Sequence, residues 1–138
     1  MASGVFDLLH PGHLHFLREA KKLGDELVVV VARDATAAKN GKTLVFDENT
    51  RLNMVSELRI VDRAVLGHEG DIYQTVKDLR PDVIALGFDQ GFSPEEVKSR
   101  SRQIGVDLKV VRITRYSHPR ASSSKIREML LSEMEGRN

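Results

Sequence analysis

The chain has 138 residues, a length typical of a single domain over residues 1–138, and its 21 Lys and Arg residues almost balance 20 Asp and Glu residues, leaving a formal net charge of +1. This balance gives no reason to propose nucleic acid or a membrane as a partner, and the absence of cysteine excludes disulfides, thiolate metal sites and cysteine nucleophiles. No apolar stretch is long enough to span a bilayer and no signal peptide precedes the first motif, so we expect a soluble, cytoplasmic protein.

The first motif is residues 4–13, Gly-Val-Phe-Asp-Leu-Leu-His-Pro-Gly-His, where a short N-terminal strand is expected to turn into a helix. Apolar residues at helical spacing follow it: Phe16, Leu17, Ala20 and Leu23. Gly24 is the expected end of that helix. The N–H groups at a helix start are unpaired and carry a partial positive charge, so a polyphosphate can bind there beside His10 and His13. This predicts chemistry on a phosphate, although two histidines at this spacing, taken alone, are equally well explained as surface or metal-binding residues.

Strand and helix patterns alternate along the rest of the chain. Continuous β-branched or apolar runs predict further strands at 27–32, 64–66, 82–86 and 108–111. The alternation predicts a Rossmann-like α/β fold, which is a doubly wound, mostly parallel five-stranded sheet with helices on both faces. In such a sheet the ligand crevice lies at the carboxyl ends of the strands.

Residues 120–127, Arg-Ala-Ser-Ser-Ser-Lys-Ile-Arg, are expected to begin the last helix. Ser122, Ser123 and Ser124 offer hydroxyls that can cap it. The free N–H groups at the same place can bind phosphate oxygens, and Lys125 adds a positive charge. Alone, this segment is better explained as an ordinary capped helix. Beside the histidine motif, the phosphate-binding interpretation is favoured.

Asp89 follows the strand at 82–86, at the edge where open α/β sheets bind ligands. Its carboxylate could bind a ribose hydroxyl or a base, help to hold a metal, or simply cap a turn. Tyr116, in the segment before the serines, is a candidate to stack on a base.

The run Gly-x-Phe-Asp-x-x-His-x-Gly-His resembles the signature of the nucleotidyltransferase superfamily that includes the cytidylyltransferases, and Ser-Ser-Ser-Lys-Ile resembles its closing motif. The resemblance implies direct in-line attack on the α-phosphate of a nucleotide, without a covalent enzyme intermediate. It implies catalytic roles for His10, His13 and Lys125. A lysine of the polar loop at 39–42 contacts the phosphates in this superfamily, which adds two candidates. The nucleotide-binding residues expected are Val5, Phe6, His10, Pro11, Gly12, His13, Lys39, Lys42, Asp89, Tyr116, Ser122, Ser123, Ser124 and Lys125.

Arg51 and Arg59 are expected on one helix whose buried stripe is formed by Leu52, Val55 and Leu58. The context of Arg59 and Asp62 resembles the cytidylyltransferases. The alternative for these charged residues is a structural salt bridge.

Segments 20–34, 61–67, 80–90 and 122–126 together most resemble the archaeal-type FAD synthases. That resemblance implies transfer of AMP from ATP to FMN, giving FAD and pyrophosphate. The alternative is a CTP:glycerol-3-phosphate cytidylyltransferase or a related enzyme. Those enzymes carry Arg-Thr-x-Gly before the serine motif, whereas residues 117–120 here are Ser-His-Pro-Arg. A nucleotide-binding sensor without turnover is a third class, which intact histidine and lysine motifs argue against.

The resemblance further implies Mg²⁺ or another divalent metal as the metal–nucleotide complex, with ATP, or CTP in the alternative, and FMN as substrates. It implies a homodimer as well. The sequence identifies no metal ligands. Family members usually have several residues before the first motif, whereas Met1, Ala2 and Ser3 precede it here.

Overall fold

The alternating strand and helix patterns are realised as a single parallel sheet in a computed structural model, which describes residues 1–118 and 122–137. The elements are β1 (Ala2–Gly4), α1 (Pro11–Lys21), β2 (Val28–Val31), α2 (Asp34–Lys39), α3 (Glu48–Ser56), β3 (Arg63–Leu66), α4 (Ile72–Leu79), β4 (Val83–Leu86), α5 (Pro94–Gln103), β5 (Lys109–Arg112) and α6 (Ser123–Glu135). The five strands lie in the order β3-β2-β1-β4-β5. The predicted Rossmann-like, doubly wound α/β fold is therefore confirmed, with a sheet that is parallel throughout.

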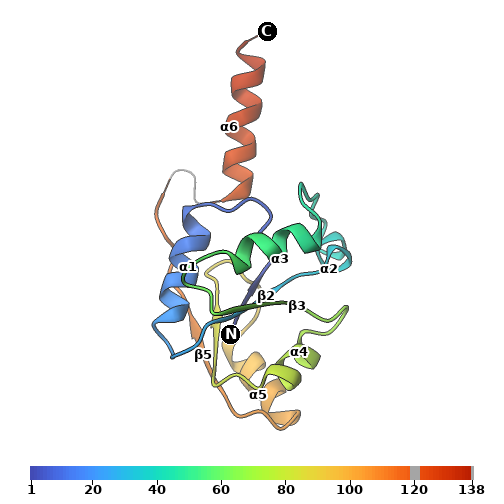
Figure 1. Cartoon of the computed structure of the whole chain (residues 1–138), viewed down its shortest axis with the longest axis vertical. Helices are drawn as coiled ribbons and strands as arrows, with labels where there is room; N and C mark the ends of the chain where they lie inside the picture. The colour runs from blue at the N-terminus through green and yellow to red at the C-terminus, as the bar shows by residue number, and fades with distance from the viewer. Residues whose placement is uncertain (119–121, 138) are drawn as a thin grey trace.

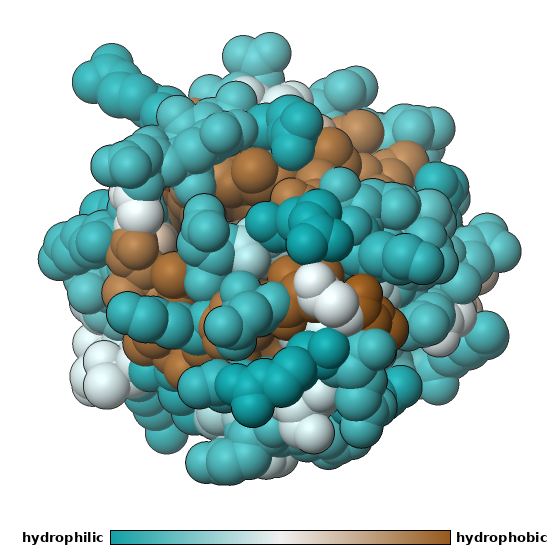
Figure 2. All heavy atoms as spheres, turned by 90° about the horizontal axis from the view of Figure 1, so that it is seen from below, coloured by the Kyte–Doolittle hydropathy of each residue, from teal (hydrophilic) through white to brown (hydrophobic). Residues whose placement is uncertain are grey.

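Two apolar clusters cover the two faces of the sheet, and the pleat of β4 separates them. Ala85 packs into the cluster with α1 and α3, whereas Ile84 and Leu86 pack into the cluster with α4 and α5. This alternation is the period of two expected for a strand that is buried on both faces. Figure 1 shows the two helix pairs on opposite sides of the sheet. Seen from the side of α4 and α5, polar side chains cover most of the surface and apolar patches show between them (Figure 2).

The strand order reverses at β1, which pairs with β2 on one side and β4 on the other. At such a switch point the loops leave the sheet in opposite directions, and a crevice opens above the carboxyl ends of the strands. The fold therefore places residues 5–13, which follow β1, at this crevice.

The structure differs from several local predictions. Helix α1 ends at Lys21, before Gly24, because turn hydrogen bonds from Leu23 and Gly24 tighten its last carbonyls. Lys39 is the last residue of α2 and not part of a loop. Arg59 lies beyond the end of α3 at Ser56, so the expectation that it shares a helix with Arg51 is wrong.

Residues 119–121 lie outside the described residues. They include Arg120 and Ala121 of the serine segment and the second half of the 117–120 window. Within the described ranges, no helix is both long and apolar enough to cross a membrane.

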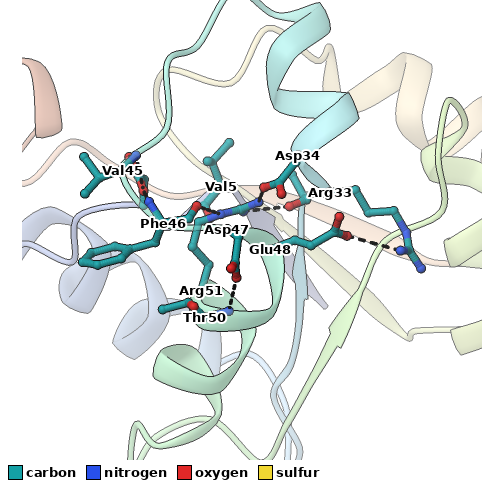
Figure 3. A network of polar contacts seen from close by, with 11 residues as sticks. Val5, Arg33, Asp34, Val45, Phe46, Asp47, Glu48, Thr50 and Arg51 are labelled. Atoms are coloured by element: carbon teal, nitrogen blue, oxygen red, sulfur yellow. Dashed lines mark hydrogen bonds and ion pairs between the residues drawn. The ribbon is translucent and has the colours of Figure 1, made fainter.

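Arg51, near the start of α3, is fully buried and joins three loops (Figure 3). Its Nη1 donates to the carbonyls of Val5 at 2.8 Å and Ala32 at 2.7 Å. Its Nε donates to the carbonyl of Phe46 at 3.1 Å, and its Nη2 pairs with Asp34 Oδ1 at 2.7 Å. Arg51 thus has a structural role: it forms an ion pair with Asp34 and fixes the backbone after β1 and β2. Asp62 is structural too, because it pairs with Lys21 and accepts the N–H of Leu27 at 2.6 Å.

Replacing Arg51 with Met is expected to lower the free energy of unfolding by about 3–5 kcal/mol, because it strands Asp34 and three carbonyls without their donor. Urea denaturation followed by circular dichroism measures this. The matched control is Arg59→Met at an exposed position, with an expected change below about 0.5 kcal/mol. If Arg51→Met does not fold, Arg51→Lys should show an intermediate loss, because one ammonium cannot replace the guanidinium fork. Equal effects at residues 51 and 59 would contradict the structural role.

Candidate active site

The turn after β1 holds an aromatic ring against backbone, which explains the first residues of the motif. A Cβ added at Gly4 would lie 2.9 Å from the ring of Phe6, so a side chain at position 4 would displace that ring. Phe6 itself adopts a left-handed conformation with φ of 54°, uncommon for a residue with a side chain, and it is almost fully buried. Its ring lies 5.1 Å from the ring of His13, at an interplanar angle of 57°. The Gly-x-Phe pair therefore forms one wall against which His13 packs.

His10 caps α1 with its own side chain. Its Nδ1 accepts the N–H of Gly12 at 3.1 Å, and Pro11 occupies the first helical position, where no N–H is needed. An accepting Nδ1 assigns the proton of the neutral ring to Nε2. The rings of His10 and His13 stack with centroids 3.7 Å apart. His10 thus starts the helix and still presents an Nε2–H donor.

The environment keeps both imidazoles uncharged at neutral pH. Burial lowers the pKa of His13 to about 3, helped by the neighbouring His10 ring and the charge of Lys42, while the backbone of Leu8 acts in the opposite direction. Burial lowers the pKa of His10 as well, and Asp89 opposes that shift. His13 Nδ1 is buried without a hydrogen-bond partner among the described residues. The two histidines therefore line the cleft as neutral rings at neutral pH.

A cleft of about 1250 Å³ opens at the carboxyl end of the sheet, above these histidines. It is lined by the loops that follow the strands and by the start of α6. The expected site residues that line it are Val5, Phe6, His10, Gly12, His13, Lys39, Lys42, Asp89, Tyr116, Ser122, Ser123 and Ser124. Pro11 and Lys125 are not among the lining residues, and Lys125 is exposed. The structure thus brings most of the expected set together at one cleft.

The serines have different roles at the start of α6. Ser122 is the N-cap, since its Oγ accepts the N–H of Lys125 at 3.2 Å. Ser123 and Ser124 follow it at the edge of the cleft. The N-terminal end of a helix longer than three turns therefore faces the same space as the start of α1, and both ends favour negative charge.

Tyr116 is already stacked within the protein. Its ring lies 5.0 Å from that of His15 and 5.9 Å from that of His118, nearly parallel to both. Its place in the cleft lining agrees with the expectation, while the predicted stacking on a base stays a prediction.

Two residues that fix the loop around Asp89 were missed from the sequence. Gln90 accepts the N–H of Gly87 at 2.9 Å and donates to the carbonyl of Ser3 at 3.0 Å. Arg112 donates to the carbonyls of Gly87 at 2.8 Å and Gln90 at 3.0 Å, and to that of Phe92. The pairing of β5 with β4 places Arg112 opposite Leu86, the last residue of β4, and so brings its side chain to this loop.

The arrangement suits alignment and charge neutralisation rather than covalent catalysis. Two helix starts, a stacked pair of neutral imidazoles and the lysines Lys39 and Lys42 surround one cleft. Such groups can hold a polyphosphate and donate hydrogen bonds where charge develops on its oxygens. Within the described residues, no group of three or more His, Asp or Glu side chains is placed to hold a metal ion.

Comparison with known proteins gives relatives along nearly the whole chain. Residues 1–129 match the model of the cytidylyltransferase-like family. A protein of Thermoplasma acidophilum named FAD synthase is 57% identical over 131 residues, covering 95% of this chain and 92% of the relative. A protein of Thermoplasma volcanium with the same name is 56% identical over 131 residues, with the same coverage of both chains.

A solved structure supports the same grouping. The crystal structure described as the lipopolysaccharide core biosynthesis protein from Thermoplasma volcanium is 59% identical and superposes with a TM-score of 0.83, covering 85% of this chain and 96% of that one. The match to the family model over residues 1–129 and these close relatives show that the chain belongs to the cytidylyltransferase-like family, beside proteins named FAD synthases.

Proposed function

We propose that this protein is an FAD synthase, which transfers AMP from ATP to the phosphate of FMN and releases pyrophosphate. The observation that carries the proposal is the stacked neutral pair of His10 and His13 at a helix start, inside a cleft that the start of α6 also lines. The FAD synthase relatives at 56–57% identity support the choice of FMN as acceptor.

The reaction is one displacement at phosphorus. An oxygen of the FMN phosphate attacks the α-phosphorus of ATP, and the bond from that phosphorus to the bridging oxygen of pyrophosphate breaks. The nucleophile is already an anion at neutral pH, so it needs no strong base. What it needs is alignment and relief of charge in the transition state.

The residues at the cleft have different roles in this reaction. The imidazoles of His10 and His13 donate hydrogen bonds to oxygens of the reacting phosphate. Lys39 and Lys42 approach the phosphates from the rim of the cleft, and the start of α6 with Lys125 binds the leaving pyrophosphate. Because Lys125 is exposed outside the cleft lining, its task requires the side chain to reach inward when ATP is bound.

Mg²⁺ belongs to this proposal as part of the substrate. It enters with the triphosphate, because Mg²⁺ in such sites is held mainly by substrate phosphates and by few carboxylates. Asp89 is the carboxylate at the cleft that could assist the metal or bind the ribose. We also propose that the protein is cytoplasmic and forms a homodimer, as the family resemblance implies.

The glycerol-phosphate alternative has less support. The most similar relatives above carry the name FAD synthase, and residues 117–118 differ from the Arg-Thr that the cytidylyltransferases have there. The name of the Thermoplasma volcanium structure makes a sugar or glycerol phosphate acceptor worth testing directly.

The function is tested by supplying ATP, Mg²⁺ and FMN and separating the products by chromatography. FAD and pyrophosphate are expected in equal amounts. Riboflavin should not replace FMN, because the proposed nucleophile is the phosphate of FMN, which riboflavin lacks. CDP-glycerol formed from CTP and glycerol 3-phosphate, without any FAD, would assign the protein to the alternative. No turnover with any pair of substrates would favour a nucleotide sensor.

Replacing His10 with Asn separates its capping role from its chemical role. Asn is a good N-cap, so the start of α1 and the thermal stability should change little. Loss of the Nε2–H donor should lower kcat by at least about 100-fold, the usual effect of removing one donor to a transition-state oxygen. A comparable loss is expected for His13→Ala. Steady-state pyrophosphate release measures both, and losses below about threefold would remove the histidines from the mechanism.

The pH dependence of kcat/KM reports the charge of the histidines. With the pKa of His13 lowered to about 3 and that of His10 lowered too, both rings stay neutral above pH 7. We expect kcat/KM for FMN to be level from about pH 7 to 8.5 and to fall below about pH 6, where the FMN phosphate gains a proton. A mechanism that needs an imidazolium would instead lose activity as the pH rises through about 6.5. A decline on that side would therefore contradict neutral donors.

A further inference from the structure

Asp7, within the first motif, is a buried carboxylate that joins three segments of the chain. Its side chain is 6% exposed. It accepts the N–H of Val45 at 2.9 Å, the N–H of Phe46 at 2.9 Å and the Nη2 of Arg127 at 2.9 Å. Arg127 Nη2 also donates to the carbonyl of Thr43 at 3.1 Å. The guanidinium therefore ties α6 both to the turn that carries the histidines and to the loop that follows Lys42.

Helix α6 has little else to hold it against the protein. None of its residues is buried, and Figure 1 shows it projecting from the body of the fold. Its large apolar side chains Leu130, Leu131 and Met134 are exposed. Within residues 1–118 and 122–137, the side-chain hydrogen bonds between α6 and the body all come from Arg127. Among the described side chains, Arg127 is therefore the one whose hydrogen bonds tie the start of α6, and with it Ser123 and Ser124, to the body.

We infer that the Arg127–Asp7 ion pair is a latch that positions the start of α6 over the cleft. Arg127 is a positioning residue: it acts through Asp7 and Thr43 on the serine segment and on the loop after Lys42. Both proposed phosphate-binding segments are thereby fixed against the histidine motif by one charged contact. This inference rests on the proposed function for its kinetic consequence, but the latch itself is a property of the free protein.

The latch predicts where the kinetic effect appears. Because the tethered segments are those assigned to the triphosphate, Arg127→Gln should raise KM for ATP and lower kcat, leaving KM for FMN nearly unchanged. The expected loss in kcat/KM for ATP is about 10- to 100-fold, the range for a hydrogen bond between charged groups. The thermal midpoint should fall less than in Arg51→Met, because α6 adds no buried residue to the core and Asp7 keeps both N–H partners although it loses its charged partner.

A double-variant cycle distinguishes the latch from direct contact of Arg127 with phosphate, since Arg127 also lines the cleft. If Arg127 acts through Asp7, then Asp7→Asn reproduces the kinetic defect and the double variant is no slower than the slower single variant. If Arg127 binds phosphate itself, the two losses multiply, and the latch is overturned. Arg127→Lys should recover part of the rate, because one ammonium can pair with Asp7 but cannot bond Thr43 with the same geometry.

Amide hydrogen exchange on the free protein tests the latch without any substrate. Faster exchange at residues 43–46 and 123–130 is expected in Arg127→Gln, with the strands unchanged. Glu128→Gln is the matched control on the same exposed helix and should exchange as the wild type does. Unchanged exchange in Arg127→Gln overturns the latch even if the wild type makes FAD. A wild type that makes no FAD but shows the exchange effect rejects the proposed function and keeps the latch.

Discussion

The buried guanidinium of Arg51 is the constraint on which the ligand-binding end of this protein depends. A charge with no exposure to solvent is stable only when its N–H groups are paired. Arg51 pairs with the carbonyls of Val5 and Ala32, the first residues beyond β1 and β2. A shift of either loop would leave a charged donor unpaired in the core, so the turn that carries His10 starts from a fixed point.

The same device recurs at the other strands. Arg33 donates to the carbonyl of Gly67, beyond β3, and Arg112 donates to that of Gly87, beyond β4. Carbonyls at the carboxyl ends of parallel strands lose their partners in the sheet, and a guanidinium with its planar fork of donors can satisfy several of them. The loops that line the cleft are therefore held by arginine side chains rather than by extra secondary structure.

The sequence predicted the strands and the histidine motif, and it missed the arginines that hold the loops. Strand positions came out within one residue, because continuous runs such as Val28–Val31 reflect burial on both faces, and burial is visible in residue type. The histidine motif was recognisable because the proposed function requires particular residues at a fixed spacing. The burial of Arg51 was not recognisable, since an arginine on a predicted helix usually faces solvent and its partners Asp34, Ala32 and Val5 lie 17 to 46 residues away. Arg112 was missed for the same reason, because its partners are set by strand register.

The neutrality of the two histidines has a local cause, which is their burial beside β1. Burial disfavours imidazolium at His13, and the stacked ring of His10 disfavours it further. A neutral N–H donor costs little desolvation free energy in a partly dry cleft. Its hydrogen bond becomes stronger as water leaves and charge develops on a phosphate oxygen. Under the proposed function, the same burial that removes the charge from these rings prepares them to stabilise a transition state rather than to attract a substrate.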